Sequence, residues 1–318
     1  MKYSGIGGQA VIEGIMMMKG EDYAVAVRRP DKEIEVKKDT YQSITKKAKI
    51  LQLPFVRGVF RFADSMIIGM RSLTYSASFF EDDEDAEPGK FEQFLDRVFG
   101  EKLESAIMAA VLVISFILAI GIFMLLPLGI ANLFKGVITS DHLMAVLEGV
   151  IRIAIFIIYI KLVSRMEDIR RTFMYHGAEH KCINCVEHGL PLTVKYVRES
   201  SKEHKRCGTS FILIVMVISI LMFMVIRVDT IWMRILSRII LVPVIAGISY
   251  EVLQCAGRSN SKFMDLVSRP GMWMQGLTTK EPDDSMIEVA IAATEAVFDW
   301  REYLTENFPG WEKQLEES

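Results

Sequence analysis

The sequence contains little cysteine, little histidine and almost no net charge. Its 318 residues include 4 Cys and 5 His, and 37 basic against 40 acidic residues give a formal net charge of −3. So few cysteines in a long chain exclude a disulfide-rich scaffold. The small net charge excludes a strongly basic nucleic-acid-binding protein. The first residues lack the apolar run of a signal peptide, so we expect none.

The apolar residues are concentrated in four long runs. Mean hydropathy is +0.28 although 24% of the residues are charged, and both values hold together only if the apolar residues cluster. A membrane-spanning helix needs about 20 apolar residues. We therefore predict a multi-pass membrane protein with four spans, formed by Ile107–Leu133, Leu143–Val163, Thr209–Ile226 and Ile231–Leu253.

The charges of the loops predict the orientation of the spans. The loop 164–207 is rich in Lys and Arg, whereas the two short loops hold only Lys135 and Arg227. Because cytoplasmic loops carry the excess of Lys and Arg, we place this loop and both termini in the cytoplasm. The expected location is the inner (cell) membrane.

The segments outside the spans predict a cytoplasmic α+β domain. Residues 9–14 are predicted to be a short strand, and residues 23–37 a hairpin with one wet and one buried face. Residues 55–79 have helical periodicity, and two interpretations stay open: a helix at the membrane surface, or one packed on the β domain. A helix beginning near Pro282 has an apolar face that would dock on the same domain.

The predicted fold class is a four-helix transmembrane bundle with a cytoplasmic α+β domain assembled from the N-terminal β region, the central loop and the C-terminal helix. Along the chain we expect a β-rich region (1–54), an amphipathic or interfacial helix (55–79), an acidic linker with a lead-in helix (80–105), transmembrane helices 1 and 2 (106–163), a His/Cys loop (164–208), transmembrane helices 3 and 4 (209–253) and a cytoplasmic C-terminal region (254–318).

One ion pair is predicted inside the second span. Glu148 and Arg152 have the spacing and order that favour a helical ion pair. Charges inside a membrane often mark a pathway for ions or protons. We favour a structural pair near the headgroups, because four helices with so few buried charges make a poor transporter.

Histidine and cysteine gather in the predicted cytoplasmic loop. Its densest part is the H-x-x-E-H motif at 176–180. On a helix, His176 and His180 share a face and can bind one zinc ion, with Glu179 as general base. A third ligand is needed, and the motif alone leaves four candidates: Glu187, His188, His204 and Cys207. Ligands from both ends of the loop would let the metal clip it shut.

A second interpretation uses the cysteines. Cys182 and Cys185, followed by His204 and Cys207, have the spacing of a structural Cys₃His zinc site. Against it, Cys182 and Cys185 would continue the helix of the H-x-x-E-H motif, where they can equally be buried thiols.

Four separated motifs resemble the YqhQ-like family of bacterial multi-pass membrane proteins: Gly7–Met17, Tyr175–Lys181, Arg206–Phe211 and Leu277–Asp284. The resemblance implies a predicted metal-dependent enzyme that retains His176, Glu179, His180 and Cys207, but not Cys182 or Cys185. It therefore favours His176, His180, His204 and Cys207 as zinc ligands and Glu179 as the catalytic residue. It also implies a role for the loop at Glu13 and Gly14.

Two classes of function remain open. The first is a membrane-embedded metal-dependent enzyme, with a hydrolase as the expected type. The alternative is a non-enzymatic membrane scaffold or biogenesis factor, whose partner at the cytoplasmic face is a translocon, a ribosome or another protein. In that case the basic residues 195–206 would contact anionic lipid of the bilayer or ribosomal RNA, the one nucleic acid expected.

Overall fold

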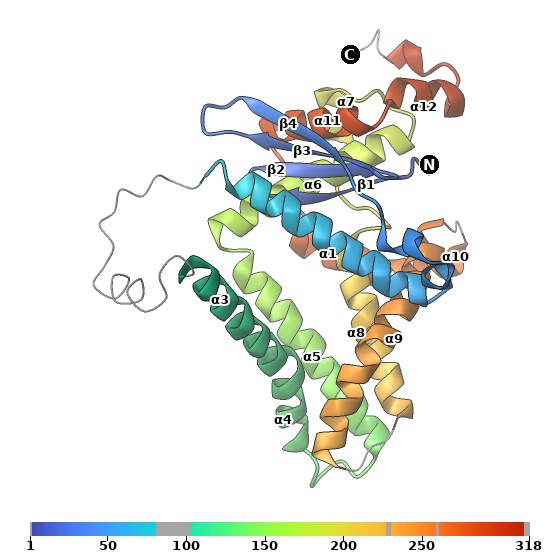
Figure 1. Cartoon of the computed structure of the whole chain (residues 1–318). Helices are drawn as coiled ribbons and strands as arrows, with labels where there is room; N and C mark the ends of the chain where they lie inside the picture. Colours follow the sequence, from blue (N-terminus) through green and yellow to red (C-terminus); the bar gives the residue numbers. More distant parts are fainter. Residues whose placement is uncertain (1, 81–102, 227–229, 259–260, 315–318) are drawn as a thin grey trace. The chain divides into compact units, whose positions relative to one another are not determined.

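A computed structural model describes residues 2–80, 103–226, 230–258 and 261–314 (Figure 1). The predicted acidic linker and most of the turn between the last two spans lie outside these residues. The chain forms two compact units, which are described separately. The first comprises Met1–Phe80, Ile160–Met222 and Ile226–Ser318, and the second Glu81–Tyr159 and Phe223–Val225.

A four-stranded antiparallel sheet forms the N-terminal part of the first unit. The strands lie in chain order: β1 (Ile6–Val11), β2 (Gly14–Lys19), β3 (Asp22–Arg28) and β4 (Ile34–Thr40). The pairing of β3 with β4 confirms the predicted hairpin. The single strand predicted for residues 9–14 is wrong, because the chain turns at Ile12 and Glu13, where Glu13 has a φ of 48°.

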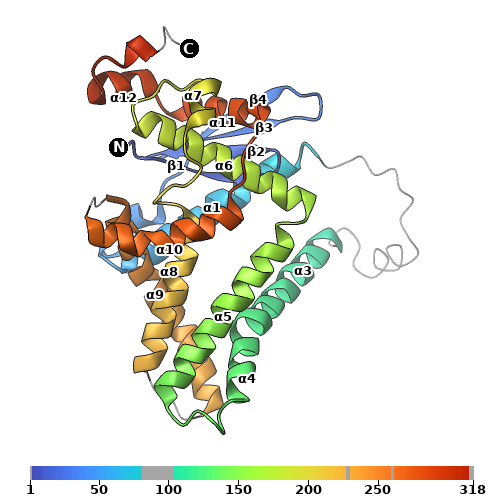
Figure 2. The ribbon, with the colours of Figure 1, turned by 180° about the vertical axis from the view of Figure 1, so that it is seen from behind.

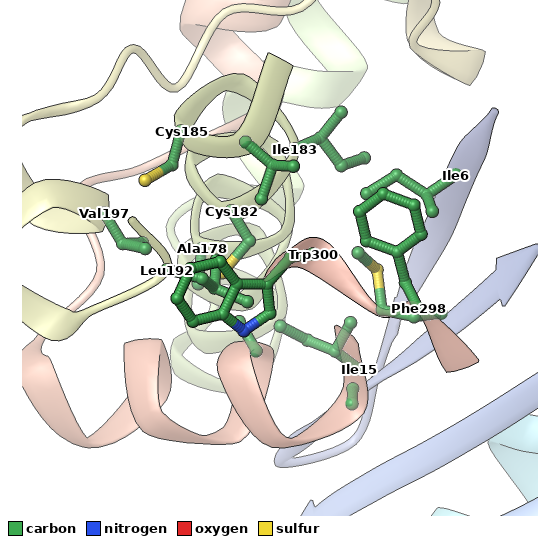
Figure 3. Close-up of a cluster of buried hydrophobic side chains, with 14 of the residues drawn as sticks. Ile6, Ile15, Ala178, Cys182, Ile183, Cys185, Leu192, Val197, Phe298 and Trp300 are labelled. Carbon is green, nitrogen blue, oxygen red and sulfur yellow. The ribbon is translucent and has the colours of Figure 1, made fainter. Parts of the chain in front are cut away.

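Two helices, α6 (Glu167–Glu187) and α11 (Asp284–Val297), cover one face of the sheet (Figure 2). The Asp283 side chain caps α11 by accepting a hydrogen bond from Met286 N at 3.0 Å, which confirms the helix predicted near Pro282. The short helices α7 (Val194–Glu199) and α12 (Trp300–Asn307) complete this layer. Its apolar core includes Ile15, Ile183, Phe298 and Trp300 (Figure 3).

The opposite face of the sheet is covered by α1 (Val56–Ala77), which follows two 3₁₀ turns (Ile44–Lys47 and Lys49–Gln52). Helix α1 confirms the helix predicted for residues 55–79. Ile68 packs with alternate residues of β3, Tyr23, Val25 and Val27. The wet face expected for the hairpin is therefore wrong for β3, because α1 buries the side that alternation would leave to solvent, whereas β4 keeps an exposed side.

The first turns of α1 dock on α9 (Ile231–Arg258). Gly58 lies so close to the Tyr250 side chain that an added Cβ would come within 2.7 Å of it. Beside this contact, the Arg57 guanidinium donates two hydrogen bonds to the Glu251 carboxylate, at 2.7 and 2.6 Å. A close helix crossing and a bidentate ion pair together fix the start of α1.

Four segments of the described residues are long and apolar enough to cross a membrane: Val113–Asn132, Asp141–Val163, Gly208–Val225 and Ile239–Ala256. They correspond to the four predicted spans. The last two belong to α8 (Gly208–Val225) and α9 of the first unit. Helix α10 (Lys262–Thr278) follows α9 and was not predicted from the sequence.

The second unit contains the other two candidate spans. Helix α3 (Leu103–Ile120) continues through a π-helical turn (Gly121–Leu125) into α4 (Leu126–Asn132), and α5 (Asp141–Val163) packs beside it through Phe123 and Tyr159, whose ring centroids are 5.3 Å apart. The predicted ion pair is present on α5, with Arg152 Nη2 2.6 Å from Glu148 Oε1.

Candidate metal centre

The structure brings His176, His180 and Cys207 together. The two histidines lie one turn apart on α6, and Cys207 is the residue immediately before α8. One ligand atom from each of the three lies within 4.8 Å of the others, and His176 Nε2 is 3.2 Å from Cys207 Sγ. Bonds of about 2.0–2.3 Å around a tetrahedral zinc ion put ligand atoms roughly 3.3–3.8 Å apart, so small shifts would complete the site.

Both imidazoles are oriented by backbone carbonyls. His176 Nδ1 lies 3.0 Å from Thr278 O, and His180 Nδ1 lies 2.6 Å from Lys202 O. A carbonyl oxygen only accepts, so each Nδ1 carries the proton. Each Nε2 is thereby left with its lone pair for a metal. Such carbonyl partners are typical of metal-binding histidines, whose tautomer and ring orientation they fix.

The Cys207 sulfur sits at the N-terminus of α8. Thr209 N donates to Cys207 Sγ at 3.4 Å, and Thr209 Oγ1 lies 2.8 Å from the same atom. Helix N-termini favour negative charge, and a thiolate is the form in which cysteine binds metals. The position of Cys207 therefore suits a thiolate ligand, and it places the cluster at the end of a candidate membrane span.

Glu179 lines a cavity of about 120 Å³ together with His176, His180 and Cys207. Its side chain is 5% exposed. Burial raises the pKa of the Glu179 carboxyl to about 7, while the nearby His176 and a hydrogen bond from the Gly8 backbone N–H act in the opposite direction. Glu179 thus borders the donor cluster as a base would, without belonging to the group of close ligand atoms.

Gly8 on β1 allows this close approach. A Cβ added there would lie 2.9 Å from Glu179 Cγ and 2.7 Å from the carbonyl oxygen of Met16. A side chain at position 8 would therefore push against Glu179 or β2. The sequence did not predict this contact, although Gly8 belongs to the first of the four resemblance motifs.

His204 lies beside the cluster rather than in it. Its ring centroid is 5.8 Å from that of His180, and its Nε2 lies 3.5 Å from Glu187 Oε2. Burial lowers the pKa of His204, so the imidazole is neutral near pH 7. Of the ligands expected from the sequence, the geometry thus favours three, and His204 faces Glu187.

Glu187 forms a buried network with Arg206, Ser4 and His204. Arg206 Nη2 pairs with Glu187 Oε1, which also accepts from Ser4 N at 3.0 Å and Ser4 Oγ at 2.8 Å. Burial raises the pKa of Glu187, but hydrogen bonding to His204 and Ser4 and the charge of Arg206 outweigh it and lower the pKa to about 2. Glu187 is therefore a structural anion that ties the N-terminus to the His/Cys loop.

Cys182 and Cys185 lie in the apolar core (Figure 3) and are not among the close ligand atoms. Burial raises the pKa of both thiols, for Cys185 to about 12, so they remain protonated. Cys185 Sγ contacts Pro191 O at 3.3 Å. The arrangement fits buried thiols and not the Cys₃His interpretation.

Polar side chains of α6 hold the other end of the loop in place. Lys181 Nζ donates to Arg198 O and Ser200 O, both at 2.8 Å. Asn184 Nδ2 donates to Ser201 O at 2.7 Å and to Glu203 O at 2.9 Å. Together with His180, these residues fix the backbone of 198–203 against α6. Sequence reasoning missed these contacts because neither Lys181, although it ends the Tyr175–Lys181 motif, nor Asn184 shows from its spacing which backbone oxygens it will meet.

The loop at Glu13 contacts α6 but does not line the cavity. Glu13 forms a bidentate ion pair with Arg171 and accepts from Tyr175 OH at 3.3 Å. The next residue, Gly14, packs closely on β3: a Cβ at this position would lie 2.4 Å from the backbone oxygen of Ala26, so only glycine fits. Glu13 thus attaches the β1–β2 turn to the helix that carries the candidate ligands.

The apolar helices and the donor cluster define a class: a protein with four candidate membrane spans and a candidate metal centre at the end of one of them. The family described as "Protein of unknown function (DUF1385)" matches residues 53–300. The chain is 35% identical to "Uncharacterized protein YqhQ" of Bacillus subtilis (strain 168) over 286 residues, which cover 90% of this chain and 89% of that protein. The chain therefore belongs to this family of YqhQ-like proteins. No solved structure matches it.

Proposed function

We propose that this protein is a zinc-dependent hydrolase that acts at the cytoplasmic surface of the inner membrane. One observation carries the proposal: His176, His180 and Cys207 present three ligand atoms within 4.8 Å of one another, and Glu179 lines the same cavity. Three protein donors leave a coordination position for water or substrate, as in catalytic zinc sites.

The donor set favours zinc. Imidazole and thiolate are ligands of soft or borderline metals, whereas magnesium and calcium prefer oxygen donors. Both Nδ1 atoms are held by backbone carbonyls, an arrangement that would raise the affinity of the two Nε2 atoms for a metal.

Glu179 is the proposed catalytic residue. When bound, the metal supplies Lewis acidity, polarising a carbonyl and making water more acidic. The Glu179 carboxylate would hold the attacking water, take its proton and pass it to the leaving group. Gly8 N–H fixes one side of this carboxylate, so the other side remains available to the cavity.

The alternative interpretation, a non-enzymatic scaffold, would use a closed site with four protein ligands. The orientation of His204 argues against this, because its Nε2 lies beside Glu187 and 3.4 Å from Arg206 Nη2. The scaffold, with a protein partner at the cytoplasmic face, is therefore only the second candidate for the function.

Metal content is the first test. Purified protein should contain about one zinc per chain, and His180→Ala or Cys207→Ser should lose it. His188→Ala is the matched control, because His188 directly follows the same helix and its Nδ1 is bonded to Asn184 O at 2.7 Å, away from the three ligand atoms. Retention of zinc by His180→Ala, or loss of it from His188→Ala alone, would contradict the site.

The second test separates the enzyme from the scaffold. In cobalt-substituted protein, a small anion such as azide should change the visible spectrum if one coordination position is open. Glu179→Gln should keep the metal and the azide response but abolish turnover. Candidate substrates are found by incubating membrane extracts with the wild type and with the variant and comparing which compounds only the wild type consumes. An unchanged cobalt spectrum would favour a closed, structural site.

A further inference from the structure

Helix α1 exposes a broad apolar face. Phe62, Met66, Met70 and Leu73 recur at intervals of three or four residues, which places them on one side of the helix. Each is between 41% and 54% exposed. The opposite side contributes Ile68 and Ser72 to the contact with the sheet and is buried. Exposed apolar surface of this extent, aligned along a helix, calls for an apolar environment.

Helix α10 has a similar exposed stripe. Phe263, Leu266 and Trp273 follow a helical repeat and are 67%, 59% and 62% exposed. Ser268 and Gln275, on the other side of the helix, are buried. Two helices from distant parts of the chain therefore present apolar faces from the same compact unit.

Both helices contact the first turn of α8, a candidate membrane span. The ring of Phe62 on α1 lies 5.6 Å from the ring of Phe211. On α10, Gln275 Nε2 donates to Ser210 Oγ at 3.0 Å, and a Cβ at Gly271 would lie 2.6 Å from the same oxygen. Figure 1 shows α1 and α10 near the end of α8 that faces the sheet. Both helices thus lie at the level where α8 begins.

We propose that α1 and α10 form a collar that lies in the headgroup region of the cytoplasmic leaflet, with their exposed stripes in the acyl-chain boundary. The occupant of these faces is the lipid bilayer, because the α1 stripe meets a candidate span at Phe211 and α10 packs on the same turn of that span at Ser210. Amphipathic helices of this kind bury their apolar side about 5–10 Å into the interface, and Trp273 is a residue type enriched there.

The flanking charges fit an anionic lipid surface. Exposed basic residues border both stripes, and Lys47 and Lys49 precede α1 beside the exposed Ile50 and Leu53. On α10, Lys262 and Arg269 are exposed next to the stripe. Lysine and arginine at this depth attract anionic headgroups. The collar needs neither metal nor catalysis, so it stands independently of the proposed function.

Spin labelling of the full-length protein in nanodiscs tests the collar. In a Cys255→Ser background, which removes the exposed native thiol, single labels are placed at Met66→Cys on α1 and Leu266→Cys on α10. Both labels should collide more with oxygen, which concentrates in lipid, than with a water-soluble nickel chelate. The background protein without an added cysteine corrects for labelling of the buried thiols.

Ser78→Cys, at the residue that follows α1, is the control. Ser78 is exposed and lies on the side of the helix away from the stripe, so its label should favour the nickel chelate. Nickel access at positions 66 and 266 equal to that at 78 would show that the stripes face water. Low access to both reagents would show that protein covers them, through a second copy or another part of the chain. Lipid exposure at one helix alone would also overturn the collar.

Discussion

Replacing Gly177 by alanine sets two opposite effects against each other. Gly177 lies in the middle of α6, between His176 and Glu179. Helix propensity alone predicts that Gly177→Ala stabilises the protein by about 1 kcal/mol. The structure predicts the reverse, because a Cβ at this position would lie 2.0 Å from the backbone oxygen of Lys280.

The magnitude follows from this contact. Ordinary van der Waals contact begins near 3.4 Å, so the Lys280 oxygen would have to move by about 3.4 − 2.0 = 1.4 Å. Overpacking costs about 1–3 kcal/mol. The same movement strains the hydrogen bond from Lys280 N to Phe173 O, 2.9 Å long, which adds roughly 1 kcal/mol. We expect net destabilisation of about 2 kcal/mol.

The substitution should also weaken metal binding. His176 Nδ1 is held by Thr278 O at 3.0 Å, only two residues from Lys280. A displaced Thr278 would release the imidazole, and loss of such a partner lowers metal affinity roughly 10–100-fold. Zinc affinity should therefore fall although no ligand is changed.

Urea unfolding of the detergent-solubilised protein, followed by tryptophan fluorescence, measures the stability change, since Trp300 and Trp311 are buried in the core of the first unit. Competition with a chelator measures zinc affinity. Gly276→Ala is the control, because it lies on helix α10 and a Cβ there meets no atom within 4 Å, so it should stabilise. Wild-type stability or better in Gly177→Ala would refute the reasoning.

Three further predictions concern other parts of the chain. The pKa of Glu187 is lowered from 4.5 to about 2, so the ionised carboxylate should stabilise the folded protein fully above pH 4.5. This contribution to the free energy of unfolding, on the order of 3 kcal/mol, should be lost as the pH falls toward 2. The stability difference between wild type and Glu187→Gln should therefore close over that range. A cysteine at exposed Glu199 should resist impermeant reagents in intact cells, and labelling from outside would contradict a cytoplasmic loop. The double variant Glu148→Leu, Arg152→Leu should insert and stay within about 1 kcal/mol of wild type; failed insertion would show that the pair is required.

The features that the sequence predicts correctly are those with a strong local signal. Four runs of about 20 apolar residues appear as four candidate spans, because span length is set by membrane thickness and needs no tertiary information. The H-x-x-E-H spacing places His176 and His180 on one face of α6 through helical geometry alone. The resemblance favoured Cys207 together with His204 as further donors, and the structure brings Cys207 to the two histidines.

The features that it misses depend on contacts between distant residues. Gly8 and Glu179 are brought together only by packing of β1 on α6. The hairpin of residues 23–37 was expected to have one wet face, because alternation along a strand does not show that a distant helix, here α1, will cover that face. Helix α10 was overlooked because Pro270 interrupts its pattern. Gln275 on this helix nevertheless holds the His204 backbone: its Oε1 accepts from His204 N at 2.8 Å, and its Nε2 donates to His204 O at 2.7 Å.

The hydrogen bonds around the donor cluster bear on what a metal would do there. From the sequence we expected a metal to clip the loop shut. In the structure, Lys181 and Asn184 hold the backbone of 198–203, and Gln275 holds His204. These hydrogen bonds hold the loop through the protein's own groups, so we expect that little of the binding free energy of zinc would be needed to fold it, in contrast to zinc fingers. A donor set already held in place by the protein is what an active site requires, and this favours the hydrolase over a purely structural zinc.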